Sequence, residues 1–216
     1  HEDHYKLDDN SDPQTSDNMR FSDTHGNGGD WRVEKQRLHW EILDGFVDAA
    51  VQTGVQKTED FNNGDNAGVG YFDVNQRSGW RWNTSKAFLR PAKARPNLTV
   101  WTEAHVEKLT FSRQADGALV CDGAVVHHQG TKVSVLAEKE VVLSAGAINS
   151  PQILQLSGVG PARLLKSLNI DVVLDAPAVG ENFQDHLQIR AVFKVKGAKT
   201  LNTLANSLVG RAKIGL

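Results

Sequence analysis

The sequence predicts a mixed α/β fold, in which a run of antiparallel strands leads into a buried strand and a helix. Residues 98–136 are rich in β-branched side chains that partly alternate with polar ones, which is typical of a half-buried sheet. The next apolar run, Val141–Ser144, is continuous, which favours a strand buried on both faces. A turn of small residues and a helix-sized apolar segment follow in "AGAINSPQILQLSGVG", residues 145–160. These features predict a β-meander followed by a strand–turn–helix unit.

The first half of the chain reads as a loop-rich segment with one main helix. Apolar residues at helical spacing predict a helix over 40–53. The stretch 60–91 is rich in Gly and Asn, and it predicts a short strand at "GYFDVNQ" and a short helix over 85–89. Pro91 is expected to limit any further helix there, because proline lacks a backbone N–H.

In the second half, short dipeptides suggest where elements begin and turn. Asp122-Gly123 lies between apolar runs and predicts a hairpin turn. Ser150 and Pro151 suggest the N-cap and first residue of a helix. The remaining elements expected from the pattern are strands near 98–102, 105–112 and 171–175, and helices over 150–156 and 161–168; a further strand near 186–196 is expected only from the family resemblance given below.

Composition excludes several functional classes. The net charge of −2 gives no electrostatic case for binding nucleic acid. A single cysteine, Cys121, excludes an intrachain disulfide and a multi-cysteine metal site, and no other metal site is expected. No apolar run approaches the roughly 20 residues of a membrane span. The polar first residues give no signal peptide, so we expect a cytoplasmic protein, with peripheral membrane attachment as the alternative.

The turn at Gly146 is the strongest candidate for a ligand site. A glycine between a buried strand and a helix lets the backbone approach a ligand closely, and the helix N-terminus favours negative charge. The alternative is a plain structural turn, because many α/β proteins share this arrangement without binding a nucleotide. Gly158 and Gly160 are expected to end the helix. "GVGPAR" is rejected as a dinucleotide fingerprint, because it follows a helix rather than a strand.

Three polar or aromatic clusters have structural interpretations that we favour. Asp185 and His186 are interpreted as a structural polar pair. A basic stretch is interpreted as a solvated face, with a loop near a diphosphate as the alternative: Lys86, Arg90, Lys93 and Arg95. Trp80 and Trp82 are interpreted as loop anchors, with a stacking platform as the alternative.

Several stretches resemble one known family. "GAINSPQILQLSGVG" is similar throughout to the second signature of the GMC (glucose–methanol–choline) oxidoreductases, which depend on FAD. "RWNTSKAFLRPAKARPNLTV", "AHVEKLTF" and "VGENFQDH" resemble further family segments in the same order. "GGDWRVEKQR" and "DFNNGDNAGVGYFDVNQR" resemble the choline and alcohol dehydrogenase branch most. The resemblance covers almost the whole chain.

The resemblance implies a flavoenzyme that oxidises a primary alcohol, choline-like or aliphatic, to an aldehyde. A hydride would pass from the small-molecule alcohol to FAD while a histidine takes the hydroxyl proton. The electron acceptor is left open between oxygen and a respiratory carrier. The implied cofactor contacts are Val106 with the adenine through its backbone, Ala145 and Gly146 with the ADP portion, and Asn83 and Thr84 near the cofactor.

The resemblance also implies that this chain is an internal fragment. Residues 1–97 would lie between the FAD and substrate domains, 98–185 would form part of the FAD-binding domain, and 186–216 would begin the antiparallel substrate-domain sheet. The family's N-terminal G-x-G-x-x-G unit and its C-terminal catalytic histidine have no counterpart, so no catalytic residue is assigned. We expect the chain alone to bind FAD poorly and to be inactive. Two alternatives stay open: a non-catalytic remnant or interaction module of the same fold, and a lyase of the family.

Overall fold

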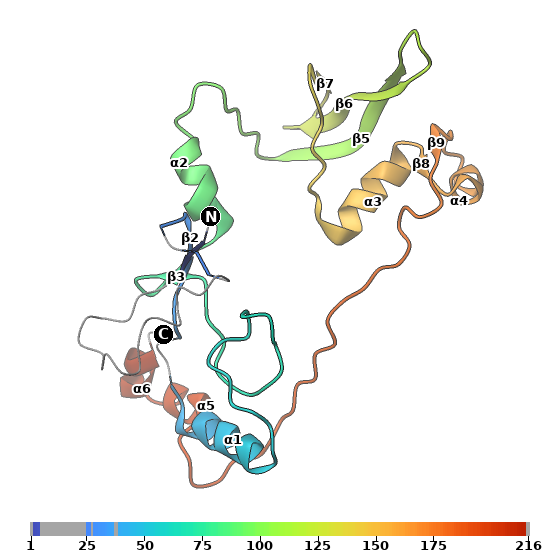
Figure 1. Ribbon diagram of the computed structural model, residues 1–216. Helices are drawn as coiled ribbons and strands as arrows, with labels where there is room; N and C mark the ends of the chain where they lie inside the picture. The colour runs from blue at the N-terminus through green and yellow to red at the C-terminus, as the bar shows by residue number, and fades with distance from the viewer. Residues whose placement is uncertain (1, 5–24, 27, 37–38, 215–216) are drawn as a thin grey trace. The chain divides into compact units, whose positions relative to one another are not determined.

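The computed structural model describes residues 2–4, 25–26, 28–36 and 39–214 of the protein. The chain forms two compact units, one made of His1–Leu98 with Ala191–Leu216 and the other of Thr99–Arg190 (Figure 1). Within the described residues, no helix is long and apolar enough to cross a membrane. The assignment of segments to FAD and substrate domains stays a prediction.

The first unit is built from short elements around one longer helix. That helix, α1 (Glu41–Gln52), confirms the expectation for 40–53. The remaining elements are β1 (Glu2–His4), β2 (Trp31–Val33), β3 (Gln76–Arg77), β4 (Trp80–Arg81), the π-helix η2 (Ser85–Leu89), α2 (Arg90–Ala92), α5 (Leu201–Ala205) and α6 (Leu208–Ile214). β1 pairs with β2 in parallel, and β3 with β4 in antiparallel orientation. Pro91 lies in the first turn of α2, where its missing N–H is not needed, and the helix ends one residue later at Ala92, as expected.

A buried histidine connects three segments of the first unit. The side chain of His25 is 6% exposed. Its Nδ1 lies 3.1 Å from Oε1 of Glu2 in β1, and its Nε2 lies 2.8 Å from Oδ2 of Asp60. Only the protonated ring can donate from both nitrogens. Burial alone would lower the pKa of His25, but hydrogen bonds and charges from Asp60 and Glu2 outweigh it and raise the pKa above its ordinary value.

Raising the pH should therefore loosen β1. The raised pKa means that His25 stabilises the fold fully below about pH 6.5, and that this contribution is lost as the pH rises through the folded-state pKa. We expect the amides of Glu2–His4 to exchange roughly tenfold faster above that pH, after correction for intrinsic rates, because one hydrogen bond to a charged group is lost. Hydrogen exchange measures this, and His25→Gln should remove the pH dependence. A pH-independent exchange rate in the unaltered protein would contradict it.

The second unit contains the predicted meander. β5 (Ala104–Arg113), β6 (Leu119–His128) and β7 (Thr131–Leu136) form an antiparallel sheet in the order β5-β6-β7. After it come α3 (Gly146–Leu156), β8 (Val159–Gly160), α4 (Ala162–Ser167) and β9 (Leu174–Asp175), and β8 pairs with β9 in parallel. The core side chains of this unit come from the sheet, α3, β8 and α4: Leu109, Val125, Val126, Ile153, Val159 and Leu165.

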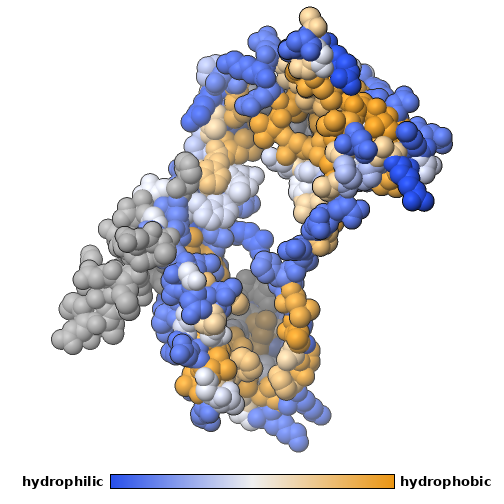
Figure 2. All heavy atoms as spheres, turned by 45° about the vertical axis from the view of Figure 1, so that its right-hand side comes forward, coloured by the Kyte–Doolittle hydropathy of each residue, from blue (hydrophilic) through white to orange (hydrophobic). Residues whose placement is uncertain are grey.

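Three expected strands are absent, and the one expected at "GYFDVNQ" is displaced, because β3 covers only Gln76–Arg77. Residues 98–102, 141–144 and 186–196 have no strand structure, although the fold class itself is confirmed. A strand needs a hydrogen-bonded neighbour, and no described segment pairs with these three. Apolar side chains of these segments therefore reach the surface: Val142 is 77% exposed and Ile189 is 86% exposed. Figure 2 shows apolar atoms at the surface of the molecule.

Two local predictions within the second unit are also wrong. Helix α3 begins at Gly146, so Ser150 and Pro151 lie inside it rather than at its start. Asp122-Gly123 lies inside β6, and the β5–β6 turn lies at Gln114–Gly117 instead, where Gly117 has a φ of +87°. The continuous apolar runs on both sides of Asp122-Gly123 allow the strand to pass through that dipeptide.

The β5–β6 hairpin contains two β-bulges. Val106 pairs with Val126 and Lys108 with Val125, so Glu107 is an extra residue in β5. Thr110 pairs with Gly123 and Phe111 with Cys121, so Asp122 is an extra residue in β6. Each bulge shifts the pairing by one residue, and the second shift reverses the first.

Candidate functional site

The residues predicted to bind the cofactor fall in both units. Val106 lies on β5, and Ala145 and Gly146 lie at the start of α3, all in the Thr99–Arg190 unit. Asn83 and Thr84 precede η2 in the other unit. The structure therefore brings the first three into one compact unit.

Gly146 gives the start of α3 an open backbone. Its φ is +88°, a conformation that glycine adopts without the strain of a side chain. A Cβ atom built at this position would meet no atom of the described chain within 4 Å. Ser150 accepts the N–H of Ala145 through Oγ at 3.0 Å, so this side chain fixes the turn from inside the helix. The backbone at Gly146 therefore faces space that a ligand can occupy.

The N-terminus of α3 is suited to a group that carries negative charge. No side chain among the described residues caps this helix. Ile148, in the first turn, is 71% exposed. The unpaired N–H groups of a first helical turn, together with the helix dipole, favour phosphate or another anion. Gly146 and this helix end therefore fit the diphosphate portion of a dinucleotide.

The backbone of Val106 faces the open edge of the meander, which we define as the side of β5 away from β6. Antiparallel ladders alternate between pairs that exchange hydrogen bonds and pairs whose N–H and C=O groups point outward. The Gln129 N–H donates to the Glu103 carbonyl at 3.4 Å, and the Val106–Val126 pair lies three pairs further along. Val106 is therefore in an outward-pointing pair. No described strand covers this edge, so its N–H and C=O fit the donor–acceptor edge of a base.

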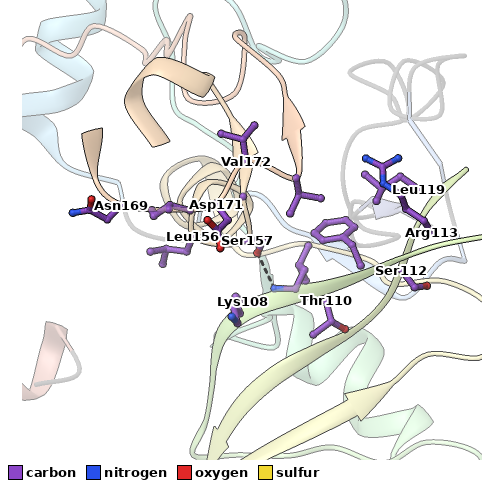
Figure 3. Close-up of a pocket in the computed structure, with 15 residues that line it drawn as sticks. Lys108, Thr110, Ser112, Arg113, Leu119, Leu156, Ser157, Asn169, Asp171 and Val172 are labelled. Carbon is purple, nitrogen blue, oxygen red and sulfur yellow. Dashed lines mark hydrogen bonds between the residues drawn. The ribbon is translucent and has the colours of Figure 1, made fainter. Parts of the chain in front are cut away.

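The same edge anchors helix α3. The Leu109 N–H donates to Oγ of Ser157 at 2.8 Å, and the Ser157 hydroxyl in turn donates to the carbonyl of Ile153. Ser157 is only 7% exposed. Figure 3 shows this bond as a dashed line, beside a cavity of about 710 Å³ between β5 and residues 169–173. Ser157 thus sets the position of α3 along β5, and no sequence pattern had indicated its role.

Asn83 stabilises the start of η2 and borders a cavity of the first unit. Its Oδ1 accepts the Lys86 N–H at 3.1 Å. Asn83 lines a cavity of about 480 Å³ together with Trp31, Arg81 and Trp82. The indole of Trp82 donates to the Asp30 carbonyl at 2.8 Å, which agrees with the interpretation of this tryptophan as a loop anchor.

His127 and His128 form contacts within the Thr99–Arg190 unit rather than a catalytic cluster. His127 contacts the Glu107 carboxylate at 2.8 Å, and His128 stacks on Trp101 with ring centroids 4.6 Å apart. The backbone N–H of His186 donates to the Asp185 carboxylate at 2.8 Å. Among the described residues no group of three ligating side chains could hold a metal ion.

Comparisons with known proteins identify the family of this chain. A family model described as GMC oxidoreductase matches residues 19–188. An alcohol dehydrogenase (acceptor) of Pseudomonas putida is 37% identical over 202 residues, which cover 92% of this chain and 36% of the relative. An oxygen-dependent choline dehydrogenase of Acinetobacter baumannii is 42% identical over 178 residues, 81% of this chain and 32% of the relative.

Solved structures show the same fold. An FAD-dependent oxidoreductase from Chaetomium thermophilum has a TM-score of 0.72 at 25% identity, over 85% of this chain and 31% of its own. Pyridoxine 4-oxidase has a TM-score of 0.65 at 28% identity, over 71% of this chain and 29% of its own. The chain spans about a third of the length of the curated relatives it matches. It belongs to the GMC oxidoreductases, a family of flavoproteins whose cofactor is FAD.

Proposed function

We propose that this chain supplies the adenosine-diphosphate side of the FAD site in an enzyme that oxidises a primary alcohol to an aldehyde. The observation that carries the proposal is the open backbone at Gly146, beside which the structure leaves space for a ligand. The names of the relatives, alcohol dehydrogenase and choline dehydrogenase, support the substrate class. FAD, when bound, supplies the hydride acceptor for this chemistry.

Each residue has a distinct role in the proposal. Ala145 and Gly146 hold the diphosphate through backbone groups at the N-terminus of α3. The N–H and C=O of Val106 pair with the adenine at the open edge. Asn83 and Thr84 are assigned near the cofactor on the family resemblance alone. None of the eight histidines of the chain is assigned the role of taking the proton from the alcohol.

Replacing Gly146 with valine should weaken FAD binding by more than about tenfold. This corresponds to a loss of more than ~1.4 kcal/mol of binding free energy. The new side chain enters space that is open in the protein alone and that the proposal fills with cofactor. The measurement is a flavin fluorescence titration of the full-length apoprotein.

Gly130→Val is the matched control, because Gly130 has a φ of +78° and equally open surroundings but lies in the β6–β7 turn. Gly130→Val carries the same backbone strain but lies away from the proposed site. It should therefore change FAD affinity by less than about twofold, which corresponds to ~0.4 kcal/mol. Equal loss of affinity in both variants would reject the placement of FAD at Gly146. Oxidation of choline and of simple aliphatic alcohols by the full-length enzyme tests the substrate class.

A further inference from the structure

The β-bulge at Glu107 separates two residues of β5 whose backbones face the open edge. Val106 faces it by the alternation of the ladder, and Leu109 faces it because its N–H reaches Ser157. In a regular strand, residues that face the same edge are an even number of positions apart. Val106 and Leu109 are three apart, so their common direction depends on Glu107 being the extra residue.

The side chain of Glu107 contacts basic side chains on both other strands of the meander. Its Oε2 lies 2.8 Å from Nζ of Lys132 on β7 and 2.8 Å from Nε2 of His127 on β6. Hydrogen bonds from Lys132 and His127 hold the pKa of the Glu107 carboxyl below its ordinary value. The extra residue is thereby fixed against the sheet rather than free to move along β5.

A one-residue slip would reverse the direction of these backbone groups. If Glu107 entered the ladder as an ordinary residue, Leu109 would come to face β6, and Ser157 would lose its donor. If the bulge moved towards the start of β5, Val106 would face β6 instead. Both slips would disturb the arrangement of α3 and Val106 along the open edge.

We propose that Glu107 is a positioning residue, which locks the register of β5 so that Val106 and the N-terminus of α3 face the cofactor together. The inference rests on the proposed FAD site. It assigns a function to an ion-pair cluster, Glu107–His127–Lys132, that contacts neither the substrate nor the cofactor.

Charge reversal tests whether the contacts of Glu107 fix the register of β5. In the full-length apoprotein, Glu107→Lys and Lys132→Glu should each weaken binding of FAD and of AMP about threefold to fivefold, as expected for an exposed ion-pair network. The double variant E107K/K132E restores opposite charges and should recover most of the lost affinity. Rescue by the swap separates a positional lock from any other role of Glu107. Affinity in either single variant within twofold of the unaltered protein, or no recovery in the double variant, would overturn the proposal.

Glu103→Lys is the matched control, because Glu103 is exposed at the start of the same hairpin and its carboxylate contacts no described cation. It makes the same charge change and should leave FAD affinity unchanged. Hydrogen exchange of the Leu109 amide reports the register without FAD, and it should quicken in both single variants and recover in the double one. If the unaltered protein fails to bind FAD, the proposed function is wrong, whereas unchanged Leu109 exchange in the single variants rejects the register lock by itself.

Discussion

Replacing Gly158 with alanine should destabilise the Thr99–Arg190 unit by roughly 2–6 kcal/mol. Gly158 ends α3 with a φ of +85°, which strains any residue that carries a side chain by about 1–3 kcal/mol. The added Cβ would also collide with the carbonyl oxygen of Asp171 and lie 2.8 Å from Cγ2 of Val173. Collisions of this kind in a packed region cost about 1–3 kcal/mol more.

Hydrogen exchange measures this effect locally in the full-length protein. The amides of Val173 and Leu174 donate to the Gly158 carbonyl at 2.8 and 3.1 Å, so their protection should fall with the stability of the turn. Gly117→Ala is the control, because Gly117 has a φ of +87° in the β5–β6 turn but no atom within 4 Å of a built Cβ. It carries the strain without the collision. Equal losses of stability in the two variants would show that the close packing at Gly158 adds nothing to the cost of the backbone strain.

Replacing Leu165 with alanine should cost about 2–5 kcal/mol, the range for truncating a large buried side chain. Leu165 is fully buried, and its side chain packs on the backbone at Gly160, where a built Cβ would lie 3.6 Å from Leu165 Cδ2. It therefore joins α4 to β8. Truncation leaves a cavity between the two elements, which lowers the free energy of unfolding of this unit.

The neighbouring residue provides the control for this substitution. Leu164 lies on the same helix but is 41% exposed, so Leu164→Ala removes the same atoms with much less burial lost. We expect it to cost less than about 1.5 kcal/mol, since only part of its side chain leaves an apolar environment. Thermal unfolding of both full-length variants checks the difference. A larger loss in Leu164→Ala than in Leu165→Ala would contradict the packing described.

The parts of the fold that depend on local pattern could be predicted from sequence. The alternation around Val106 and Val126 predicts half-buried strands, and the meander follows from three such runs in succession. Helix α1 follows from its apolar spacing in the same way. Gly158 was expected to end α3, and its positive φ confirms that expectation.

The parts that depend on non-local partners could not be predicted. Val141–Ser144 has the composition of a buried strand, but strand structure requires a hydrogen-bonded neighbour that no described segment provides. Asp122-Gly123 was interpreted as a turn, while Asp116-Gly117 in "QADGA" carries the same dipeptide signal and lies at the real turn. Nothing local distinguishes the two, because the choice depends on how the strands pair over their full length.

The candidate site shows the same division between local and non-local information. Gly146 could be identified from sequence because an unusual backbone conformation leaves a residue-type signal. The contribution of Ser157 could not, because a serine at a helix end is common and its partner, Leu109, is 48 residues away in the chain. The role of Glu107 could not be predicted either, because a bulge is defined only by how two strands pair.

The two bulges of the β5–β6 hairpin also bear on how the length of this segment can vary. Glu107 and Asp122 each oppose no residue of their own, so the pairs on either side stay matched whether or not the extra residue is present. A single-residue deletion at either position should remove that bulge and leave the hairpin correctly paired, whereas a deletion at Leu109 or Val125 would misalign the strands. Natural sequences of this hairpin should therefore gain and lose residues at these two places, and a relative without the residue at 107 has no slip to prevent.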